Sequence, residues 1–181
     1  MSSGNIVRGR SPLVGARGRV LVLLGAVCGA VACNSTTDAS GGVSIVGTWT
    51  LTSVGGKSLP ATFNFPYTLN NVSYNTAQIY NSGTAVLNSN LSANVVFVVR
   101  DVSTQGSTTL FDQTETDSSS GTYVLNGSAF SLTLSGTGQS AVTRTGTLSG
   151  STLSVTSIDT TTLGNNQTVV DTLAFVFTKS G

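Results

Sequence analysis

Residues 45–60 (IVGTWTLTSVGGKSLP) alternate between apolar and polar side chains with a period of two. Ile45, Trp49 and Leu51 fall on one face of this segment, and threonines occupy the other face. Such a period is typical of a β-strand that buries one face and exposes the other to water. The segment therefore predicts a strand whose buried face carries Trp49, the single tryptophan of the chain.

The C-terminal half repeats this alternating pattern. Asn126-Gly127 separates two alternating segments, and this dipeptide is a strong hairpin signal because both residues tolerate positive φ. In the second segment Phe130 and Leu132 alternate with polar residues, and Phe175 belongs to a similar alternating segment near the C-terminus. We therefore expect a series of short antiparallel strands in this half.

The region between residues 61 and 120 gives weaker strand signals. Residues 61–75 contain Pro66, so they predict an edge strand or a covering loop. Asn81-Ser82-Gly83 predicts a hairpin turn. The apolar run 95–99 (VVFVV) predicts a buried strand, and Ser118–Gly121 predicts a break in the chain.

These segments amount to about eight strands joined by short turns, and no stretch has helical periodicity. Short connections imply antiparallel pairing, because parallel strands need long crossovers. Closing such a sheet removes its exposed edges. We therefore predict an all-β fold, a single antiparallel up-and-down β-barrel of about eight strands, with a two-sheet β-sandwich as the alternative.

The first 32 residues have the features of a secretory signal peptide. Four arginines without any acidic residue precede an apolar run over residues 20–32. That run is short for a transmembrane helix and ends in Ala30-Val31-Ala32, the small-residue pattern that precedes a cleavage site. We therefore expect residues 1–32 to be removed.

Ala30-Val31-Ala32-Cys33 also resembles the lipobox of bacterial lipoproteins, in which the cysteine is lipidated and becomes the first mature residue. This resemblance implies a lipid anchor at Cys33 and a place in the bacterial cell envelope, at the outer membrane or facing the periplasm. Residues 33–43 are polar and end in glycines, which is typical of a flexible tether. Residues 44–181 would then form the folded domain. The alternative is a secreted protein cleaved near Cys33.

The composition excludes several classes of function. The chain has no histidine, and Cys33 is the only cysteine expected in the mature protein, so a Ser-His-Asp triad and a zinc site are both excluded. Without the leader, four basic and seven acidic residues remain, a net charge of about −3. Nucleic-acid binding requires a clustered basic face instead. We expect no enzyme activity, cofactor, metal or nucleic-acid partner.

Three carboxylates precede the serine run and are the candidates for a metal site or a hydrolytic site: Asp112, Glu115 and Asp117. Together with serine and backbone oxygens they could bind Ca²⁺, but they lack the regular ligand spacing of a calcium loop. A two-carboxylate glycosidase would also need an aromatic sugar subsite, which the sequence does not offer. The pattern favours a solvated polar loop.

Arg144 falls on the apolar face of its predicted strand, together with Val142 and Leu148. That face should point into the barrel, and a buried guanidinium needs a partner. One interpretation is a polar contact for the head group of an apolar ligand. The other is a structural cation that reaches water at the rim or stacks on Trp49.

Gly47-Thr48-Trp49 resembles the Gly-x-Trp motif that begins the first strand of the lipocalins. Together with the segments SGTYVL, TGTLSGSTLSV and LAFVFTK, it is most similar to the lipocalin-like domains of small bacterial lipoproteins. The resemblance covers residues 44–179. It implies an eight-stranded barrel with Trp49 at the closed end, and Lys179 is the nearest match to the cation that stacks on this tryptophan in lipocalins.

These observations predict a cell-envelope lipoprotein whose barrel binds or carries a small apolar or amphipathic ligand. The residues predicted to contact the ligand are Phe130, Leu132, Val142, Arg144, Leu148 and Phe175. The alternative is a structural or interaction lipoprotein whose barrel is filled by its own side chains. A continuous internal void above roughly 300 Å³ would favour binding.

Overall fold

A computed structural model describes residues 44–136 and 140–181 of the chain. The predicted signal peptide and the tether with Cys33 lie outside these residues. The described residues form ten β-strands and no helix, so none of them forms a helix that could cross a membrane. The strands are β1 (Gly47–Val54), β2 (Lys57–Ser58), β3 (Ala61–Leu69), β4 (Val72–Leu87), β5 (Ser92–Gln105), β6 (Thr108–Asn126), β7 (Ala129–Gly136), β8 (Val142–Ser149), β9 (Thr152–Thr162) and β10 (Thr168–Lys179).

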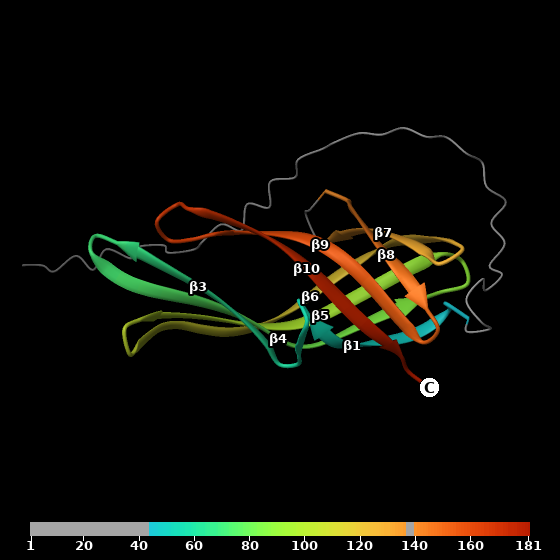
Figure 1. Cartoon of the computed structure of the whole chain (residues 1–181), viewed down its shortest axis with the longest axis horizontal. Helices are drawn as coiled ribbons and strands as arrows, with labels where there is room; N and C mark the ends of the chain where they lie inside the picture. The colour runs from blue at the N-terminus through green and yellow to red at the C-terminus, as the bar shows by residue number, and fades with distance from the viewer. Residues whose placement is uncertain (1–43, 137–139) are drawn as a thin grey trace, which may run out of the picture.

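Eight of these strands close into an antiparallel barrel (Figure 1). Strands β4 to β10 pair with their sequence neighbours, β10 pairs with β1, and β1 pairs with β4 to complete the circuit. The two remaining strands extend the sheet, with β3 on β4 and β2 on β1. The predicted eight-stranded barrel is therefore confirmed, and the sandwich alternative is wrong.

The predicted hairpin turn at residues 81–83 is wrong, because these residues lie inside the continuous strand β4. Strand β4 pairs with β3 up to Tyr80 and with β1 from Thr84 onward, and its register against β5 shifts between Tyr80 and Ser82. The small residues therefore mark a β-bulge where the strand changes partner. Gly83 is needed there, since a Cβ on it would lie 2.7 Å from the Phe97 ring.

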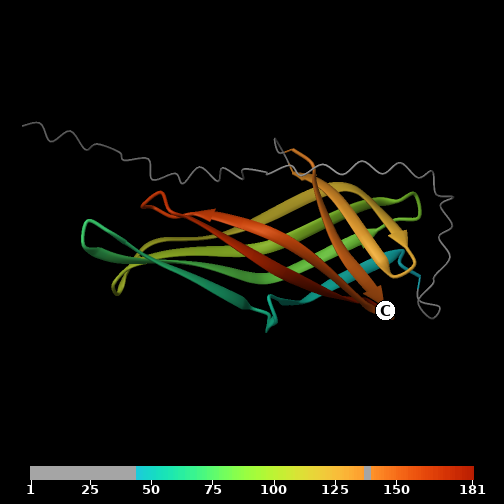
Figure 2. The same cartoon turned by 45° about the horizontal axis from the view of Figure 1, so that its top comes forward.

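Three long hairpins, β3–β4, β5–β6 and β9–β10, extend beyond the barrel on the same side (Figures 1 and 2). Strand β6 runs without interruption from Thr108 to Asn126, so the predicted break at 118–121 is wrong. At the hairpin tips the Asn165 side-chain amide donates to the carbonyl oxygen of Thr68 over 3.4 Å. We call this side the open end of the barrel.

The C-terminus lies at the opposite end of the barrel (Figure 1). Trp49 closes this end, since its register partner is Lys179, the last residue of β10. Its side chain is fully buried, and the indole N–H donates to the carbonyl oxygen of Ile45 over 2.9 Å. The Lys179 ammonium lies 5.7 Å from the centre of the indole ring and donates to the carbonyl oxygen of Ser44. The tryptophan and the cation implied by the family resemblance are therefore both in place.

The same contact explains the glycine that precedes this tryptophan by two positions. Gly47 has a φ of 139°, a conformation that side chains disfavour. A Cβ at this position would also lie 3.2 Å from the Lys179 Cε atom. Glycine therefore lets the chain enter β1 while the lysine lies over the indole.

Candidate functional site

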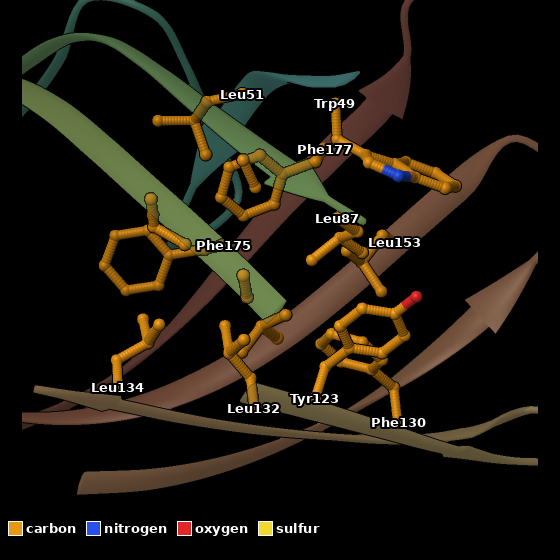
Figure 3. Packing of buried hydrophobic residues seen from close by; sticks show 14 of the residues in the cluster. Trp49, Leu51, Leu87, Tyr123, Phe130, Leu132, Leu134, Leu153, Phe175 and Phe177 are labelled. Carbon is orange, nitrogen blue, oxygen red and sulfur yellow. The ribbon is translucent and has the colours of Figure 1, made fainter. Parts of the chain in front are cut away.

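Alternate residues of the barrel strands point inward and surround a cavity of about 70 Å³. Most of its lining is apolar, as Figure 3 shows for side chains that converge from strands around the barrel. The aromatic lining residues pack against one another, with ring centres 5.3 Å apart for Phe97 and Phe175 and 5.5 Å apart for Tyr80 and Phe175. The aromatic lining residues are Tyr80, Phe97, Phe130, Phe175 and Phe177.

Polar side chains line the same cavity, and they occupy its side toward the open end. On β9, Ser157 lies nearer to the hairpin tip than Leu153, and on β6, Asp117 lies nearer to its tip than Tyr123. The cavity is therefore apolar toward Trp49 and polar toward the mouth. Its polar lining residues are Gln78, Asp117, Ser119, Arg144 and Ser157.

Arg144 is half-buried in this polar part of the lining. Its Nε donates to the Ser157 hydroxyl oxygen over 2.9 Å, and Ser157 is only 7% exposed. Arg144 contacts Ser157, whereas Trp49 is the register partner of Lys179 several residues further along the sheet, so the interpretation that Arg144 stacks on the tryptophan is wrong. Sequence reasoning missed Ser157, although it follows Leu153 and Val155 at the strand period.

The structure brings together four of the six residues predicted to contact a ligand. Phe130, Leu132, Arg144 and Phe175 all line the cavity, whereas Leu148 and Val142 do not. Leu148 is 1% exposed and packs in the core instead. Val142 is half-buried at the first position of β8. The role of the four lining residues in binding remains a prediction.

The three candidate carboxylates lie on a strand and not on the predicted polar loop. Glu115 and Asp117 point to the inner face of β6, whereas Asp112 points outward and forms an ion pair with Arg100. The Arg100 Nε donates to Asp112 over 2.6 Å, and this hydrogen bond lowers the pKa of Asp112. Within residues 44–136 and 140–181, no three His, Cys, Asp or Glu side chains cluster in a way that could hold a metal ion.

Tyr123 is buried in the core beside the cavity-lining Phe130. Its ring stacks on Phe130 with centres 6.0 Å apart, and its hydroxyl donates to the carbonyl oxygen of Asn88 over 2.8 Å. Burial raises the pKa of this phenol, so it stays neutral at physiological pH. The polar residues that line the cavity carry amide, hydroxyl, carboxylate and guanidinium groups.

An eight-stranded antiparallel barrel with a tryptophan at its closed end and an internal cavity is a lipocalin-type barrel. The family described as lipocalin-like domain matches residues 45–155, from just before β1 into β9. The chain belongs to this family, whose barrel gives it the capacity to hold a ligand. No curated protein and no solved structure gives a significant match to the chain.

Proposed function

We propose that this chain is a lipid-anchored protein of the bacterial cell envelope, at the outer membrane or facing the periplasm. Its barrel binds or carries a small apolar or amphipathic molecule and performs no enzymatic reaction. The polarity gradient of the cavity is the observation that carries this proposal. An apolar side next to Trp49 suits an alkyl or ring group, and a few placed polar groups at the mouth suit a head group.

The size of the cavity limits the ligand. At about 70 Å³ it lies well below the roughly 300 Å³ of an ordinary ligand pocket. Only a short apolar segment fits inside, and the rest of the molecule would lie between the three long hairpins. The same small volume favours a second candidate function, a structural or interaction protein whose barrel is filled by its own side chains.

A neutral short-chain probe separates these two functions. We expect 1-hexanol to bind saturably and weakly, with a Kd of tens of millimolar, because only about three methylene groups would be buried at about 0.8 kcal/mol each. Methyl chemical shifts of the purified protein, followed by NMR during a titration, measure this. Filling the cavity with Val155→Phe should abolish binding, with Val155→Leu as a milder variant.

Val124→Phe is the matched control, because Val124 is 54% exposed on the outside of β6. It should leave hexanol binding unchanged. Thermal unfolding of each variant shows whether the barrel is intact. If the wild type shows no saturable shifts, or if the Val155 variants bind hexanol as tightly as the wild type, the structural protein with a filled barrel is favoured.

The anchor is tested separately at Cys33. Stable membrane attachment needs more than one acyl chain, and a lipidated N-terminal cysteine can carry several. Cys33→Ala should move the protein from the membrane fraction to the soluble fraction and abolish labelling by a fatty-acid analogue. Cys28→Ala is the matched control and should change neither, because Cys28 lies in the segment expected to be removed. A Cys33→Ala protein that still carries the label would rule out Cys33 as the lipidated residue, and an unlabelled, soluble wild type would favour a secreted protein.

A further inference from the structure

The inner face of the barrel continues past the cavity onto the long hairpins, and this continuation is acidic. Asp101 follows the cavity-lining Val99 at the strand period of two, and Glu115 precedes Asp117 in the same way. Asp171 precedes the buried Leu173 on β10. No register shift intervenes in any of these stretches, so all three side chains share the inner face.

The acidic residues of β5 and β6 form a continuous band. Gln78 on β4 is the register partner of Asp101 on β5, and Glu115 on β6 is the partner of Val99. Asp101 and Glu115 are therefore diagonal neighbours, which long side chains can bridge. Asp171 lies on β10, which borders the mouth on another side. All these carboxylates, Asp117 included, are partly buried.

Among the side chains that the structure describes, this inner face carries four carboxylates and one cation, Arg144. Of the other described cations, Arg100 points outward, Lys179 lies at the closed end, and Lys57 of β2 is exposed and lies over the Phe63 ring. The mouth thus has a charge of about −3 at neutral pH. Low-dielectric walls focus such a field and raise the local concentration of cations.

We propose that the molecule held by this barrel is cationic: a short alkyl group that enters the cavity, joined to an ammonium-type head group that lies in the acidic mouth. This inference rests on the proposed function and specifies its ligand. Asp117 is the nearest contact for the head group, because it lines the cavity itself. Arg144 donates to Ser157 and reduces the negative charge of the mouth without reversing it.

Three probes with the same chain test the sign of the charge: hexylammonium, 1-hexanol and hexanoate. We expect hexylammonium to bind about tenfold more tightly than hexanol, and hexanoate to bind several-fold more weakly than hexanol. Raising the salt from about 0.05 M to about 0.5 M should reduce these differences, because salt screens partly exposed charges. NMR titration of the purified protein gives all three dissociation constants.

Asp117→Asn should reduce the ratio of hexanol to hexylammonium dissociation constants several-fold. The ratio is the readout because any effect of the substitution on the cavity itself acts on both probes. Asp112→Asn removes the same charge from the outer face and should alter neither dissociation constant. If hexanol and hexanoate bind as tightly as hexylammonium, or if both asparagine variants act alike, the cationic ligand is refuted while the binding function stands. If none of the three probes binds, the binding function itself fails.

Discussion

Replacing Trp49 with alanine is expected to lower the free energy of unfolding by about 3–5 kcal/mol, a large part of the stability of a domain of this size. The indole is fully buried at the closed end, where it donates to Ile45 and lies beneath Lys179. Its removal leaves a cavity at the base of the barrel and a carbonyl group without its donor. Both effects act in the same direction.

Chemical denaturation of the wild type and the variant measures this loss. Val124→Ala is the control and should change stability by less than about 0.5 kcal/mol, since Val124 is mostly exposed. The fluorescence of the wild type should also be blue-shifted in the native state and shift to the red on unfolding. A native emission maximum like that of tryptophan in water, or a loss below about 1 kcal/mol, would contradict the closed-end assignment.

Adding a single methyl group at Gly146 is expected to cost about 3 kcal/mol, the upper end of the usual range for overpacking. A Cβ at this position would lie 2.0 Å from the carbonyl oxygen of Ser154 and 2.9 Å from the α-carbon of Val155. These atoms belong to the backbone of β9, so no side chain can rotate away to relieve the clash. The strands β8 and β9 would have to separate.

Denaturation of Gly146→Ala against Thr145→Ala tests this close approach. Thr145 is the exposed neighbour on the outer face of β8, so its substitution should cost less than about 1 kcal/mol. If the two variants are equally stable, β8 and β9 do not pack as closely as described here.

The sequence was sufficient to predict the barrel because its signals are local. Period-two alternation and short polar turns specify antiparallel neighbours, and Asn126-Gly127 indeed joins β6 to β7. The buried face of the first strand was also predicted correctly from the sequence, since Ile45, Trp49 and Leu51 are all buried. In such cases local pattern and long-range pairing agree.

Two wrong predictions concern segments whose composition is compatible with both a turn and a strand. Asn81-Ser82-Gly83 has the composition of a turn, but a bulge within a long strand uses the same residues. Only the change of partner from β3 to β1 distinguishes the two, and that pairing is long-range. The polar run before Gly121 likewise belongs to a strand, because β5 and β7 pair with it on either side.

The site was only partly predictable for a related reason. Alternation places Val142, Arg144 and Leu148 on the inner face but says nothing about their level along the barrel axis. Arg144 lines the cavity and Leu148 packs in the core because the two residues lie at different levels along this axis. The acidic mouth requires the registers of several strands, so it could not be derived from any one segment.

Intermolecular nuclear Overhauser effects from bound 1-hexanol would test the central claim most directly, because they report where the alkyl chain lies. The account predicts contacts between the chain and the methyl groups of the cavity-lining residues Leu132, Leu134 and Val155. Contacts confined to exposed apolar residues such as Ile158 and Val170, with none to the interior, would contradict it.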